Sequence, residues 1–135
     1  MKITELKSLE NKPYSELYHD GTYLGCFEPM YFIYDDLPRY KPDKENISFE
    51  ATYSRLLEHF EEIPCRNAAA GDLVIFKIYG KILHCGVMLD KTNLIHVFKE
   101  DKHRIHRLKF LKKSASSFLR RKAGKEQEEG TPIPI

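Results

Sequence analysis

Three β-rich runs separated by very short turns occupy the middle of the chain and limit the folds that it can adopt. They cover residues 71–79, 82–89 and 94–98, with Gly80-Lys81 and residues 90–93 as the connections between them. Turns this short join antiparallel neighbours, because parallel strands need a crossover of about a dozen residues or more. These runs therefore predict an antiparallel meander, and residues 103–110 supply a fourth strand.

The half of the chain before the meander has helical periodicity instead. Apolar residues between positions 27 and 37 lie close to one helical face, and Pro29 fits only if this helix begins near Cys26. A second helix is expected over residues 48–63, whereas residues 114–122 fit either a short helix or a last strand. Helices followed by a meander predict an α+β fold, with N-terminal helices packed on an antiparallel sheet.

The length of 135 residues allows one domain. We expect a single domain over residues 1–125 and a flexible C-terminal tail over residues 126–135. No apolar run is long enough to cross a membrane, and the first residues have no apolar signal segment. These features predict synthesis in the cytoplasm without a signal peptide, and no membrane partner.

Positive charge is concentrated late in the chain. The net charge is +2, but residues 102–125 hold ten Lys or Arg residues and no acid. Such a stretch can bind an anionic polymer, or it can be a solvated face that balances the acidic remainder. The segment lacks interleaved aromatic residues suited to base stacking, so the pattern does not favour nucleic acid as a partner.

The cysteines predict free thiols and no metal site. Cys26, Cys65 and Cys85 are an odd number without a CxxC pair, which argues against a disulfide framework. Spacings among the cysteines and histidines match no structural zinc site, so we expect neither a metal nor another cofactor.

One cysteine and two histidines have the chemistry of a nucleophilic site. Cys26 lies at a predicted helix start, where free N–H groups and the helix dipole lower the pKa of a thiol. His84 and His96 lie on consecutive predicted strands, and their even separation allows them to face each other across a hairpin with Asp90 at its midpoint. One imidazole could then orient the other. The alternative is a buried apolar cysteine and two partly exposed polar histidines.

The same residues resemble a known family. Residues 71–74 have the sequence Gly-Asp-Leu-Val, residues 84–89 His-Cys-Gly-Val-Met-Leu, and residues 94–96 Leu-Ile-His. This succession, with its twelve-residue step between histidines, resembles the NlpC-type cell-wall peptidases, which are small papain-like cysteine peptidases. Pro13-Tyr14, twelve residues before Cys26, matches the Pro-Tyr that precedes the nucleophile of the family. The resemblance covers about residues 12–110.

The resemblance implies a papain-like NlpC-type fold and a set of roles. Cys26 would be the nucleophile, His84 the general base, His96 the orienting residue and Tyr14 an accessory group near the thiol. The implied substrate is the peptide stem of bacterial peptidoglycan, hydrolysed at the bond between D-glutamate and the diamino acid through a thioester. Cys85 would belong to the core, and Cys65 would lie in a loop. The other histidines match no catalytic position and are expected on the surface: His19, His59, His103 and His106.

The surroundings of Cys26 leave a second function open. The family usually has Asp-Cys-x-Gly at the nucleophile, whereas this chain has Gly25-Cys26-Phe27-Glu28. The alternative is a catalytically degenerate module with a structural or binding role in phage tail assembly. Without a signal peptide, a phage or prophage protein that is virion-associated or released to the cell wall is the expected setting, with phage tail proteins as partners. A related acyltransferase of permuted fold would have its histidine before its cysteine, which is not the order here.

Overall fold

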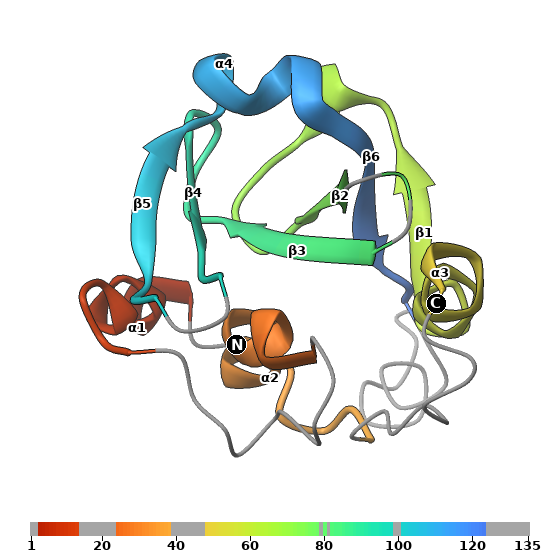
Figure 1. The fold of residues 1–135 in the computed structure, drawn as a ribbon, viewed down its shortest axis with the longest axis horizontal. Helices are drawn as coiled ribbons and strands as arrows, with labels where there is room; N and C mark the ends of the chain where they lie inside the picture. The colour runs from red at the N-terminus through yellow and green to blue at the C-terminus, as the bar shows by residue number, and fades with distance from the viewer. Residues whose placement is uncertain are drawn as a thin grey trace, which may run out of the picture.

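A curved antiparallel sheet of six strands, flanked by short helices, forms the body of the protein (Figure 1). The computed structural model describes residues 3–13, 24–38, 48–78, 80, 82–98 and 101–123. The helices are α1 (Ile3–Leu6), α2 (Glu28–Ile33), α3 (Phe49–Leu56) and α4 (Leu108–Leu111), and the strands are β1 (Phe60–Ile63), β2 (Leu73–Ile78), β3 (Ile82–Met88), β4 (Asn93–His96), β5 (Arg104–Arg107) and β6 (Ala115–Arg121).

The order of the strands in the sheet is β1-β6-β2-β3-β4-β5, and every described pair is antiparallel. Strands β2 to β5 form the predicted meander, while β6 returns to lie between β1 and β2. Figure 1 shows α2 along one side of β3, with α1 near the start of β5 and α4 at the opposite end of the molecule. The predicted α+β fold, with helices on an antiparallel sheet, is confirmed.

Two predicted elements differ from the observed ones. The second helix ends at Leu56, and residues 60–63 form β1 instead, because they pair with β6 and thereby bury Phe60 in the core. The fourth strand ends at Arg107, where α4 follows. Residues 115–121 form the last strand, which is one of the two predicted alternatives. The proposed tail, residues 126–135, lies outside the described residues.

The two faces of the sheet bury different clusters. Alternate residues of a strand point to opposite faces, so Leu83, Cys85 and Val87 of β3 pack into the core beneath α2. The intervening residues, His84 among them, lie on the face that α4 covers, where His84 contacts the ring of Phe76. Cys85 is therefore a core residue, as predicted.

The start of α2 is where the sequence places it. Cys26 lies in the 3-10 turn η3 (Leu24–Phe27), and Pro29 occupies the first turn of α2, where its missing N–H costs nothing. The helix ends at Ile33, and the hydroxyl of Tyr34 then donates a hydrogen bond of 2.8 Å to the carbonyl of Gly71. This bond fixes the end of α2 at the start of β2. Among the described helices none has the length and apolar character to cross a membrane.

Candidate active site

The Cys26 thiol lies against an unpaired stretch of the β3 edge. Its Sγ is 3.9 Å from the carbonyl oxygen of Leu83, and the side chain is only 4% exposed. Odd-numbered residues of β3 turn their peptide groups toward β4, as the bond from Leu89 N–H to the Asn93 carbonyl shows. Strand β4 pairs with β3 only from Gly86 onward, so the peptide groups beside His84 are left for the thiol.

Burial determines the protonation of this thiol. It raises the pKa of Cys26 to about 12, although hydrogen bonds from the backbone N–H groups of Cys85 and of Cys26 itself act in the opposite direction. The expected lowering of the thiol pKa by the helix start is therefore wrong for this conformation, because loss of water disfavours the thiolate more than local N–H groups favour it. At neutral pH the thiol carries its proton.

His84 and His96 form a hydrogen-bonded pair, with 2.9 Å between Nε2 of His84 and Nδ1 of His96. Both rings are buried, at 4% and 5% exposure. His96 lies opposite Gly86 in the ladder, so the two histidines are diagonal neighbours, and the prediction that they face each other directly across Asp90 is wrong. The hydrogen bond still forms because the observed register differs from the predicted one by two residues, and a shift of two keeps both side chains on the same face of the sheet.

Gly86 creates the space for this pair. A Cβ at position 86 would lie 2.8 Å from Cδ1 of Leu94 and 3.4 Å from Cβ of His96. A larger residue would therefore force the Leu94 side chain to move, and it would crowd the backbone oxygen of Ile95, 3.3 Å away, at the point where the imidazoles meet.

A third imidazole continues the pair. Nδ1 of His106 lies 2.8 Å from Nε2 of His96, and His106 is half-buried on β5. The expectation that His106 is a surface residue is wrong, because β5 pairs with β4 and places His106 opposite Leu94, diagonal to His96. All three histidines have even residue numbers and lie on successive strands. This spacing was the sign in the sequence that they could share one face of the sheet.

Both buried imidazoles are neutral near pH 7. Burial, with a smaller contribution from the neighbouring His96, lowers the pKa of His84 to about 3. Burial also lowers the pKa of His96 to about 4, helped by His106 and His103 and opposed by Asp101. Neutral imidazole is the form that can take a proton from a thiol.

Phe98 covers the ring of His84. The two rings stack in parallel, with 4.2 Å between centroids and 6° between planes. Phe98 is itself 46% exposed, so it separates the buried imidazole from solvent on that side.

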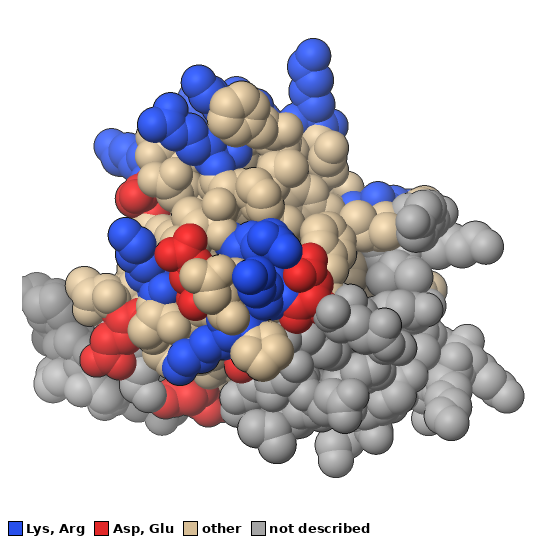
Figure 2. Space-filling view, turned by 60° about the vertical axis from the view of Figure 1, so that its left-hand side comes forward, with Lys and Arg blue, Asp and Glu red and all other residues tan. Residues whose placement is uncertain are grey.

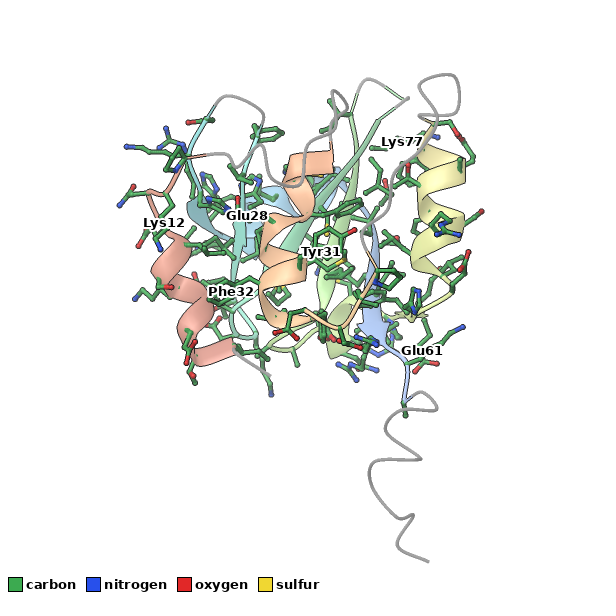
Figure 3. All side chains as sticks on the ribbon, turned by 90° about the horizontal axis from the view of Figure 1, so that it is seen from below. Lys12, Glu28, Tyr31, Phe32, Glu61 and Lys77 are labelled. Atoms are coloured by element: carbon green, nitrogen blue, oxygen red, sulfur yellow. The ribbon has the colours of Figure 1, made fainter. Side chains whose placement is uncertain are left out.

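His103 is the second histidine wrongly expected on the surface. It is fully buried, with Nδ1 2.8 Å from the carbonyl of Lys12 and Nε2 3.5 Å from Oε1 of Glu28. Figure 3 shows Glu28 and Phe32 on the side of α2 turned toward α1, and Tyr31 on the other side. His103 thus joins the first turn of α2, two residues after Cys26, to the N-terminal segment.

Several basic side chains of residues 102–125 form ion pairs and hydrogen bonds within the fold. Arg120 donates two hydrogen bonds to the buried carboxylate of Asp72, at 3.0 and 2.8 Å, and Arg121 pairs with Asp36 at 2.7 Å. Lys122 donates to the carbonyl of Leu57. Blue side chains gather instead at the end of the molecule where α4 lies (Figure 2), around a hollow lined by Lys91, Thr92, Arg107, Leu108, Lys109 and Lys112.

The remaining predicted residues divide into described and undescribed ones. Tyr14 and His19 lie outside the described residues. Cys65 is a half-buried free thiol in the turn η5 (Cys65–Asn67), and His59 is half-buried. In the part of the chain that the structure describes, no group of three or more His, Cys, Asp or Glu side chains is placed to hold a metal ion.

The fold and the sequence match known proteins. The model of the NlpC/P60 family matches residues 36–120, which is more than half of the chain and includes the strands that carry the histidines. A crystal structure of a protein similar to a lipoprotein of the NLP/P60 family, from Staphylococcus aureus, superposes with a TM-score of 0.51 at 20% sequence identity. The match covers 87% of this chain but 39% of that one. No curated protein matches. The chain belongs to the NlpC/P60 family, whose members are in general cysteine peptidases that act on peptidoglycan.

Proposed function

We propose that this protein is a cysteine peptidase that hydrolyses the peptide stems of bacterial peptidoglycan, with Cys26 as nucleophile, His84 as general base and His96 as the residue that orients His84. The carrying observation is that the Cys26 thiol lies against the peptide groups on both sides of His84, whose ring is held by His96. Nucleophile, base and orienting residue are the three parts that thiol catalysis requires.

The protonation states favour a concerted first step. Since burial keeps both the thiol and the imidazole neutral, His84 takes the Sγ proton as sulfur attacks the carbonyl carbon of the substrate. The tetrahedral intermediate collapses when His84 returns that proton to the leaving nitrogen, the C–N bond breaks and a thioester forms on Cys26. Water then attacks the thioester with His84 again as base, which releases the acid and restores the thiol.

The scissile bond is proposed to be the one between D-glutamate and the diamino acid, with Tyr14 as an accessory group near the developing oxyanion. This assignment rests on the resemblance of the Pro13-Tyr14 and histidine motifs to those of NlpC-type peptidases. The substrate lies in the cell wall, so the proposed place of action is the wall, reached by release or on a virion.

The second candidate is a catalytically degenerate module with a binding or structural role, as in phage tail assembly. The deep burial and high pKa of the Cys26 thiol favour it, because a nucleophile must be reached by its substrate. Phe27 and Glu28 after the cysteine favour it as well.

Release of amino groups from purified peptidoglycan and from a defined stem peptide separates the two candidates. We expect turnover by the wild type and a loss of about a thousand-fold or more in Cys26→Ser, because removal of a nucleophile leaves only binding and electrostatic effects. Cys65→Ser is the matched control, since Cys65 is a free thiol outside the site, and it should keep wild-type turnover. Equal rates for Cys26→Ser and wild type would show that the nucleophile is misassigned. A folded but inactive wild type would favour the degenerate module.

A further inference from the structure

The hydrogen-bonded pair of histidines continues into a row of three imidazoles, His84, His96 and His106, which is defined here as the histidine row. Both ring nitrogens of His96 are used: Nδ1 is 2.9 Å from Nε2 of His84, and Nε2 is 2.8 Å from Nδ1 of His106. Successive rings meet edge to face, with centroids 5.2 and 5.0 Å apart. Both contacts therefore have the geometry of hydrogen bonds within one continuous row.

We propose that His106 is a positioning residue that fixes the tautomers of the row, so that His84 presents an unprotonated Nδ1 to the nucleophile. The proposal rests on the proposed function for its catalytic meaning, but the tautomers themselves are independent of activity. Neither the family match nor the sequence motifs assign a role to His106.

The tautomers of the three rings are linked. A neutral imidazole has one N–H donor and one acceptor nitrogen. In a row of three neutral rings joined by two bonds, both protons must therefore point the same way along the row. With the protons directed toward His106, His84 is protonated on Nε2 and its Nδ1 keeps a lone pair. In the opposite direction Nδ1 of His84 carries the proton and cannot accept another.

Burial selects the first direction. In the first direction the terminal N–H lies on Nε2 of His106. This residue is half-buried, so water can accept a hydrogen bond from it. The second direction would put the terminal N–H on Nδ1 of His84, in a ring that is 4% exposed and stacked under Phe98, so water reaches this ring less easily than it reaches His106. A poorly solvated N–H is costly. His106 thus acts as the acceptor at the accessible end of the row.

The groups around the row keep its middle ring neutral. His106 and His103 both disfavour a proton charge on His96, and Asp101 acts in the opposite sense. Phe98 stacks on His84 and meets the edge of His96, with 5.3 Å between centroids, so the ring planes are held while the protons are arranged.

Two substitutions at position 106 distinguish the effect of the acceptor nitrogen from the effect of the size of the ring. His106→Phe keeps an aromatic ring but has no acceptor, whereas His106→Asn places an amide oxygen near the position of Nδ1. Nitrogen-15 NMR of the histidine rings in the full chain reports which nitrogen carries each proton. We expect His84 and His96 to be protonated on Nε2 in the wild type and in His106→Asn, and to become tautomeric mixtures in His106→Phe. His59→Phe, which removes a histidine outside the row, should leave both spectra unchanged.

Activity on a stem peptide provides the second readout. We expect His106→Phe to lower kcat about 10-fold with little change in KM, as for loss of a group that orients an active residue, and His106→Asn to recover most of it. Wild-type tautomers in His106→Phe would overturn the proposal whatever the activity. A wild type without peptidase activity would instead overturn the proposed function, while the NMR comparison would still decide the role of His106.

Discussion

Acid should destabilise this protein at a pH where most proteins keep their stability. The unfolded chain binds a proton at His84 and at His96 as the pH falls below their ordinary value of 6.5, whereas the folded chain binds them only near pH 3 and pH 4. Because the unfolded state binds more protons in this interval, the free energy of unfolding falls as the pH falls from about 7 to about 4. It should be nearly constant above that interval as far as these two groups are concerned.

The size of the effect follows from the two pKa values. A pH of 5 is about 1.5 units below the ordinary pKa of each histidine in the unfolded chain, and each unit corresponds to about 1.36 kcal/mol. Each buried histidine therefore costs about 2 kcal/mol at pH 5, and the two together about 4 kcal/mol. Carboxylates with lowered pKa values, such as Asp36 and Asp90, titrate below pH 5 in both states and add little.

Urea unfolding followed by circular dichroism at pH 7.5 and pH 5.0, at constant ionic strength, measures this difference. The wild type should lose about 4 kcal/mol between the two pH values, and His84→Gln/His96→Gln should lose little, whatever its absolute stability. His59→Gln is the control for removing a histidine outside the row. A wild-type loss below about 1 kcal/mol, or an equal loss in the double variant, would refute the conclusion that these two imidazoles are buried and neutral.

Two further changes test single contacts by the same urea assay. Asp72→Asn should lower the free energy of unfolding by about 1–2 kcal/mol, because it weakens the two hydrogen bonds that Arg120, itself 42% exposed, donates to the buried carboxylate; an effect below about 0.5 kcal/mol would contradict it. Gly86→Ala should cost about 1–3 kcal/mol, because the new Cβ would meet Cδ1 of Leu94 at 2.8 Å. It should also weaken the contact between the two strand histidines and reduce peptidase activity, so full stability and activity would contradict the tight approach of β3 and β4.

Local signals in the sequence were enough for much of the fold. The short turns predicted the meander, and Pro29 located the start of α2 correctly. Ser48 accepts a hydrogen bond of 3.0 Å from the N–H of Ala51 and caps the second helix, which therefore begins where the sequence predicts it. Each of these signals acts within a few residues of the chain, which is why the sequence alone reveals it.

The errors have a common physical origin in contacts between distant residues. Phe60 continues the helical periodicity of the segment before it, and only its pairing with Arg121 of β6 makes it a strand residue. His103 and His106 are polar residues in a basic segment, and their partners lie on other elements of the fold. The thiol of Cys26 is governed by burial against β3, which outweighs the local effect of the helix start. The roles of Cys26, His84, His96 and Tyr14 remain predictions for the assays above.

The position of β6 between β1 and β2 has a consequence for how the protein is made. Ile63 of β1 pairs with Phe118 of β6, and Leu73 of β2 pairs with Leu119, so neither strand has this neighbour until residues 115–121 have left the ribosome. Until then β1 presents open backbone groups, and the edge of β2 that will receive β6 is bare, which invites pairing with other chains. Closing such distant contacts is slow. The nascent chain should therefore depend on late, concerted completion of the sheet, and a chain stopped before residue 115 should aggregate rather than persist as a smaller folded domain.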